Sequence, residues 1–87
     1  AYALKVTGES MLPVYRAGDI VIVSPAANVR RGDRVVVKSA AGEVMAKLLE
    51  NRSREGIDLR SFNPEFPDIH LAAEQIVWLA RIVWASQ

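Results

Sequence analysis

Short runs of consecutive β-branched residues constrain the fold of this chain most strongly. VIV occupies 21–23 and VVV occupies 35–37, and each run begins two residues after a Gly-Asp pair. Gly and Asp favour turns, whereas Val and Ile favour strands. A strand that is apolar at successive positions is covered on both faces, or uses one face as a subunit interface. The pattern therefore predicts a sheet whose strands are reached by apolar side chains from both sides.

The same alternation of β-branched runs and turn residues continues along the chain, which is one domain spanning residues 1–87. We expect strands at 3–7, 19–24, 34–39, 43–50, 57–61 and 76–84, loops at 28–33, 51–56 and 62–68, and at most a short helical turn within 10–18. A small antiparallel sheet limits its open edges by curling. The predicted fold class is all-β and mainly antiparallel, a compact, partly closed barrel-like sheet.

Composition excludes several classes of protein. Eleven Lys and Arg residues nearly balance ten Asp and Glu residues, so the chain lacks the concentrated positive charge of a nucleic-acid binder. The absence of cysteine excludes disulfides, thiolate metal sites and a Cys nucleophile, and it fits a cytoplasmic location. The apolar run IVWLARIVW is interrupted by Arg81 and is too short to span a bilayer. We therefore expect no membrane association, metal, cofactor or small-molecule ligand.

The stretch GESMLP, residues 8–13, places a serine between a Gly and a Pro. Ser10 is then either an ordinary turn residue or a nucleophile presented on a tight turn, and the second interpretation requires a base. The only histidine, His70, lies in a polar, Pro-containing stretch that favours a solvated or strand-edge position. Lysine is the remaining type of base.

Lys47 differs from the other lysines, Lys5 and Lys38, because its neighbours in the predicted strand are apolar. Strand alternation places it on one face with Met45 and Leu49. Its stem could cover apolar surface while its tip stays in water, which the pattern alone favours, or the whole side chain could be buried. Only burial suits a base, since desolvation lowers the pKa of lysine from its ordinary value near 10.4.

Four segments together carry a family resemblance: GESMLPVYRAGDIVIV, RRGDRVVV, EVMAKLLE and LRSFNPEF. Over nearly the whole chain the sequence resembles the C-terminal serine peptidase domain of LexA, UmuD and phage repressors, which has a signal-peptidase-like β fold. The resemblance implies that Ser10 is the nucleophile, Lys47 the general base, and the backbone amides of Glu9 and Ser10 the oxyanion donors. The motif positions that support this assignment are Gly8, Met11, Pro13, Gly18 and Asp19.

The resemblance also implies a biological role. Such a domain dimerises, and it follows a helix-turn-helix domain that binds operator DNA in a longer parent chain. Self-cleavage of a bond upstream of the domain, promoted by the activated RecA filament, inactivates the repressor in the DNA-damage response. Ala41-Gly42 resembles the cleaved pair but lies downstream of the serine, so we interpret it as a hairpin turn.

Several alternatives remain open on the sequence. The domain could be a non-cleaving dimerisation or regulatory module, a signal-peptidase-like enzyme, or a β-domain in which Ser10 is a turn residue and Lys47 reaches water. Trp78 and Trp84 are either core residues or part of a dimer interface. Arg30, Arg31 and Arg34 are interpreted as a solvated turn.

Overall fold

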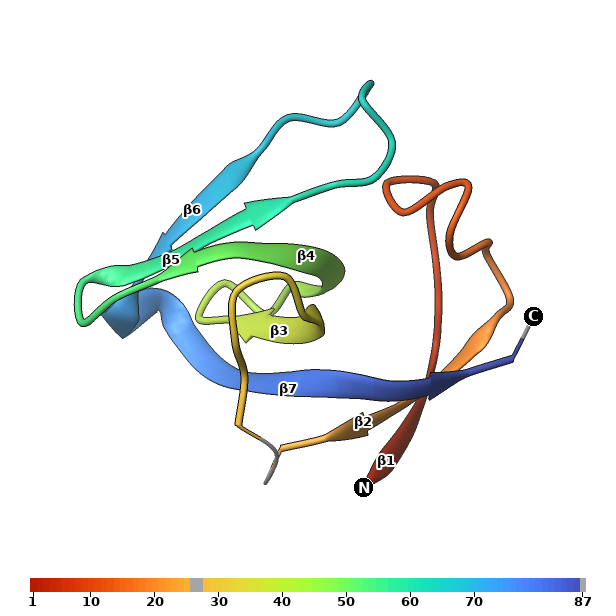
Figure 1. The fold of residues 1–87 in the computed structure, drawn as a ribbon, viewed down its shortest axis with the longest axis horizontal. Helices are drawn as coiled ribbons and strands as arrows, with labels where there is room; N and C mark the ends of the chain where they lie inside the picture. The colour runs from red at the N-terminus through yellow and green to blue at the C-terminus, as the bar shows by residue number, and fades with distance from the viewer. Residues whose placement is uncertain (26–27, 87) are drawn as a thin grey trace.

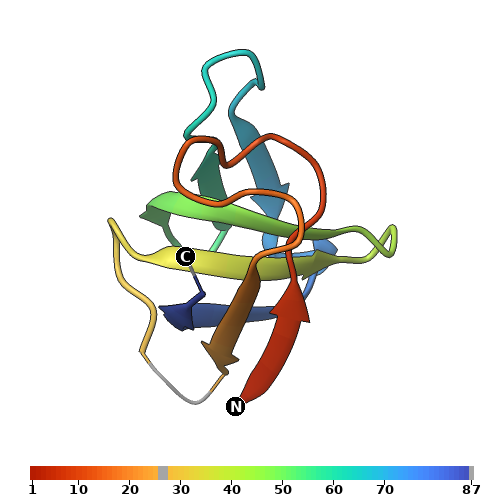
Figure 2. The same cartoon turned by 90° about the vertical axis from the view of Figure 1, so that its right-hand side faces the viewer.

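A single antiparallel sheet forms the molecule (Figure 1). The computed structural model describes residues 1–25 and 28–86, and within them it contains seven strands in the order β1-β2-β7-β3-β4-β5-β6. The elements along the chain are β1 (Tyr2–Lys5), β2 (Ile20–Ser24), β3 (Arg34–Ser39), β4 (Val44–Arg52), β5 (Gly56–Arg60), β6 (Ile69–Ala72), the 3₁₀ turn η1 (Ala73–Gln75) and β7 (Ile76–Ala85). Strands β1 and β6 are the two edges, so the twisted sheet is not closed (Figure 2). The all-β prediction is confirmed.

The predicted strands agree closely with the observed ones, with one omission. β3 has the predicted limits, and the other five differ at their ends by one or two residues. Strand β6 was not predicted, because it has only four residues, includes a histidine and pairs only with β5. The expected helical turn is a single turn in which the Tyr15 amide donates to the Met11 carbonyl at 2.9 Å. No helix in the described part of the chain has the length and hydropathy needed to cross a membrane.

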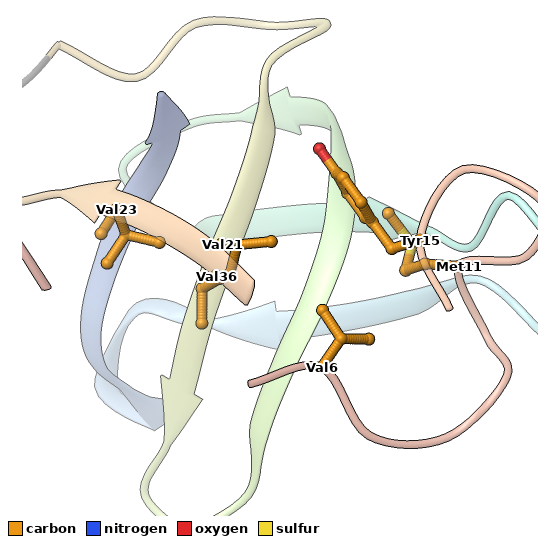
Figure 3. Packing of buried hydrophobic residues seen from close by; sticks show 7 residues of the cluster. Val6, Met11, Tyr15, Val21, Val23 and Val36 are labelled. Carbon is orange, nitrogen blue, oxygen red and sulfur yellow. The ribbon is translucent and has the colours of Figure 1, made fainter. Parts of the chain in front are cut away.

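The central strand β3 explains the run of three valines. Val35 and Val37 pack into one cluster with residues of β4, β5 and β6, and Val36 packs into another with residues of β2, β7 and the β1–β2 loop. Each of the three is at most 2% exposed. The prediction that apolar side chains cover both faces is therefore confirmed. Figure 3 shows the second cluster, in which Val21 and Val36 lie beside Val6.

Both Gly-Asp pairs form the same local turn before a strand. The Asp19 carboxylate accepts a hydrogen bond from the Arg16 amide at 2.9 Å, and the Asp33 carboxylate accepts one from the Arg30 amide at 2.8 Å. An aspartate that satisfies a backbone amide three residues earlier stabilises a tight turn. These pairs therefore start β2 and β3.

The Ala41-Gly42 pair lies in the turn between β3 and β4, as predicted. The Gly42 amide donates to the Ser39 carbonyl at 2.9 Å, and the Ser39 amide donates to the Glu43 carbonyl at 2.8 Å. The pair is thus accounted for by the geometry of a short hairpin.

Candidate active site

The loop between β1 and β2, residues 6–19, carries Ser10. Two hydrogen bonds close its base: the Val6 amide donates to the Asp19 carbonyl at 2.8 Å, and the Gly18 amide donates to the Val6 carbonyl at 2.9 Å. Met11 and Tyr15 anchor the loop, since each is only 2% exposed and both side chains enter the core (Figure 3). These contacts hold the loop at both ends and in its middle.

Ser10 itself is half-buried on the turn that opens this loop. Gly8, two residues earlier, has a φ of +79°, a conformation that residues with a Cβ rarely adopt. Pro13, three residues later, is exposed and limits the helical turn. Gly8 and Pro13 therefore flank the serine on this turn, and Gly18 and Asp19 close the loop.

Lys47 lies near the middle of β4 and is 5% exposed. Its neighbours on the same face of β4 are Met45 and Leu49, and its cross-strand partner on β3 is Val35. Burial among these apolar groups lowers the pKa of Lys47 from its ordinary value, because desolvation disfavours the ammonium form. The interpretation that the pattern alone favoured, an apolar stem with a tip in water, is wrong.

Ser10 and Lys47 line the same small pocket. Its volume is about 130 Å³, and its walls come from β1, β2, β3, β4 and the start of the β1–β2 loop. Among the residues that the structure describes, no hydrogen bond joins the two side chains. Among the described residues that line the pocket, Lys5 of β1 is the other titratable side chain, and the hydroxyl residue Thr7 lies beside it and the apolar groups.

A second serine, which sequence analysis did not single out, contacts Lys47 directly. The Lys47 ammonium nitrogen Nζ donates a hydrogen bond to Ser61 Oγ at 2.7 Å, and Ser61 is 6% exposed. Ser61 follows the last residue of β5. The ladder that pairs Leu48 with Arg60 would pair Lys47 with Ser61 at its next step. Antiparallel register therefore brings the two side chains to the same face.

Asn63, two residues further on, holds the turn that carries Ser10. Its backbone amide donates to the Ser10 carbonyl at 3.0 Å, and its side-chain nitrogen Nδ2 donates to the Glu9 carbonyl at 3.1 Å. Figures 1 and 2 both show the β5–β6 loop beside the β1–β2 loop. Both Ser61 and Asn63 lie in LRSFNPEF, one of the four segments that carry the family resemblance. The sequence analysis assigned no function to either residue.

The amides predicted as oxyanion donors lie on this clamped turn. Within the described residues, neither the Glu9 nor the Ser10 amide donates a hydrogen bond. The carbonyl of the peptide unit between them accepts hydrogen bonds from the Asn63 side chain and the Leu12 amide. Two backbone donors thus stay available next to the Ser10 side chain.

Other residues considered on the sequence lie outside the pocket. His70 is exposed on the edge strand β6, with its Nδ1 2.6 Å from Asp58 Oδ1. Arg30, Arg31 and Arg34 are all exposed, the first two in the turn before β3 and Arg34 as the first residue of β3. Arg34 also places its guanidinium near the rings of Tyr15 and Phe62.

The two tryptophans on β7 differ in burial. Trp78 is partly buried and packs against the core, and Trp84 is 57% exposed.

Comparison with known proteins identifies the family of the chain. The family described as Peptidase S24-like matches residues 1–83. Repressor protein C of Rhizobium phage 16-3 is 32% identical over 95 aligned positions, covering 100% of this chain and 36% of that protein. Prophage repressor CohE of Escherichia coli K12 is 33% identical over 72 positions, covering 80% of this chain and 31% of that protein. The chain thus spans about a third of the length of these relatives. On this match, the chain belongs to the S24 peptidase-like family.

Proposed function

We propose that this chain is the C-terminal peptidase and dimerisation domain of a phage-type, LexA-like transcriptional repressor, and that it inactivates the parent repressor by self-cleavage. The observation that carries the proposal is the pocket that Ser10 and a desolvated Lys47 both line, in a chain of the S24 peptidase-like family. Two relatives that bear the name repressor support the regulatory role.

The chemistry assigns one step to each group. Neutral Lys47 removes the proton of the Ser10 hydroxyl, and Oγ forms a bond to the carbonyl carbon of the peptide being cleaved. The amides of Glu9 and Ser10 donate to the negative oxygen of the tetrahedral intermediate. The carbon–nitrogen bond then breaks as Lys47 returns the proton to the leaving amine, and water hydrolyses the acyl-enzyme. Burial of Lys47 supports this role because it increases the neutral fraction.

Unpaired strand edges beside the pocket support binding of an extended segment. The first half of β4, residues 44–47, pairs with β3 but not with β5, and β1 pairs only with β2. A segment of the parent chain that lies between these edges would form main-chain hydrogen bonds and direct a side chain into the pocket. A volume of about 130 Å³ suits a small side chain at the cleaved bond.

Dimerisation is the second part of the proposal. Strand β7 exposes three large apolar side chains, Val77 at 57%, Val83 at 49% and Trp84 at 57%. Large exposed apolar residues, and Trp above all, are typical of protein interfaces. A dimer through β7 would join two DNA-binding domains of the parent chain on a palindromic operator, and cleavage promoted by the activated RecA filament would separate them.

The test is self-cleavage of the parent repressor, followed by intact mass over several hours from pH 7 to pH 10. We expect fragmentation upstream of this domain that rises with pH and is lost in Ser10→Ala and Lys47→Ala. The matched controls Ser24→Ala and Lys38→Ala, which change residues outside the pocket, should cleave normally. A parent chain that stays intact at every pH, and also with activated RecA filament, would exclude self-cleavage and leave the non-cleaving dimerisation module.

The short Lys47–Ser61 contact makes Ser61 an alternative candidate for the nucleophile. Ser61 is the serine hydrogen-bonded to the lysine, but it does not line the pocket that Ser10 shares with Lys47. We therefore assign Ser10 as the nucleophile. Cleavage that survives Ser10→Ala and is abolished by Ser61→Ala would reverse this assignment.

A further inference from the structure

We infer that residues 61–63 form a positioning segment for the proposed reaction, with Ser61 orienting the amine of Lys47 and Asn63 orienting the Ser10 turn and its oxyanion amide. This inference rests on the proposed self-cleavage. It concerns residues to which neither the motif nor the family match gives a role.

A bulge in β4 decides which residue faces Lys47. The β4–β5 register shifts between Leu49 and Asn51, which leaves Glu50 as the extra residue. Without that shift, the register seen at Asn51 and Arg52 would continue and place Phe62 opposite the lysine. A slip of one residue exchanges the two faces of a strand. The bulge therefore brings the Ser61 hydroxyl to the lysine.

A hydroxyl is well suited to orient a lysine that must lose its proton. Ser61 Oγ can accept an N–H from either the ammonium or the neutral amine of Lys47, so the contact at 2.7 Å survives deprotonation. A carboxylate at that position would instead stabilise the ammonium and raise the pKa of the lysine. The serine thus restricts the position of Nζ while leaving the desolvation of Lys47 to set its basicity.

The Asn63 side chain helps to fix the direction of a backbone donor. The Glu9 carbonyl accepts hydrogen bonds from Asn63 Nδ2 and from the Leu12 amide, each at 3.1 Å, and it belongs to the same peptide unit as the Ser10 amide. In a planar trans peptide the carbonyl and the amide point in opposite directions. Holding the carbonyl on the Asn63 side therefore turns the Ser10 N–H to the opposite side, where an oxyanion can accept it.

Both contacts come from one short segment, so they are coupled. Phe62 lies between the two and packs against Arg34, which also packs against Tyr15 of the serine loop, with Cζ 5.6 and 5.7 Å from the two ring centroids. The nucleophile turn and the lysine strand are far apart in sequence. Residues 61–63 connect them directly, and thereby hold Ser10 and Lys47 at a fixed separation.

The first test is the rate of self-cleavage of the parent repressor against pH. Ser61→Ala should slow cleavage on the order of 10–100-fold, the effect of misplacing a reacting group by about 1 Å. Ser61→Thr, which restores the hydroxyl, should recover most of the rate. Ser61→Asp should move the pH midpoint of cleavage upward, which loss of packing alone would not do.

Asn63→Ala should lower the rate at high pH by about 10–100-fold without moving that midpoint, because it alters the oxyanion amide and leaves the lysine in place. Matched controls are Ser53→Ala and Asn28→Ala, which change exposed side chains that lie outside the pocket and away from the β4 bulge. A cleaving wild type in which Ser61→Ala and Asn63→Ala keep the full rate would overturn the inference and leave the proposed function intact.

A wild type that does not cleave would contradict the proposed function. A second measurement then tests separately whether Ser61 positions the amine of Lys47. The chain has three lysines, so ¹³Cε labelling gives three resonances, assigned through Lys5→Arg and Lys38→Arg. Lys5 is the only other titratable side chain of the described residues that lines the pocket. Ser61→Asp should raise the pH at which the Lys47 resonance titrates. An unchanged titration would overturn the positioning of Lys47 by Ser61.

Discussion

Replacing Lys47 with methionine tests the buried state of this side chain through the pH dependence of folding. Methionine keeps an unbranched apolar stem and removes the titrating amine. In the folded chain, burial lowers the pKa of Lys47, whereas the unfolded chain has the ordinary value. Between these two values the unfolded state binds a proton that the folded state has released, so the stability of the wild type rises with pH in this window.

The size of the effect follows from the single proton involved. In that window, the free energy of unfolding of the wild type should rise relative to Lys47→Met by up to about 1.4 kcal/mol per pH unit. Below the folded pKa and above the ordinary one, the difference between the two proteins should be constant. Loss of the Ser61 hydrogen bond adds a further difference between them. The slope therefore reports the desolvation, and the offset reports the remaining contacts.

The assay is urea unfolding followed by the fluorescence of Trp78 and Trp84, from pH 6 to pH 11, for the wild type and Lys47→Met. Lys38→Met, which removes a lysine from β3 outside the pocket, is the matched control for losing one positive charge. A difference in stability that does not change with pH, or that falls as the pH rises, would refute the burial argument and the proposed role of Lys47 as a base.

Two further substitutions test the framework of the site. Arg34→Ala should lower the free energy of unfolding by about 0.5–1 kcal/mol for each of its two ring contacts, measured by urea unfolding; an unchanged midpoint would show that these contacts do not stabilise the fold. Gly56→Ala should destabilise by about 1–3 kcal/mol in the same assay, since a Cβ would lie 2.9 Å from Ala72 Cα and closer still to the Leu71 carbonyl. An alanine variant as stable as the wild type would mean that the backbones of β5 and β6 can move apart to make room for the Cβ.

The strand pattern was predictable because its causes are local. β-branched runs, Gly-Asp turns and a short hairpin are specified by neighbouring residues, so six of the strands and the coverage of both faces of β3 followed from the sequence. Strand β6 did not, because four residues between a Pro-containing loop and a 3₁₀ turn carry too weak a pattern. Ser10 and Lys47 came from the motif resemblance, and the structure adds that they line one pocket.

What the sequence by itself determined is therefore the alternation of strands and turns and the residues that are candidates for chemistry. The tertiary structure decided that Lys47 is buried. A lysine between apolar residues of a strand gives the same sequence pattern whether its amine is buried or reaches water. It also decided that Ser61 faces the lysine, which depends on a one-residue bulge, and that Asn63 holds the Glu9 carbonyl across 54 residues. Strand periodicity is a property of adjacent residues, whereas register and clamping depend on contacts between segments that meet only when the sheet has formed.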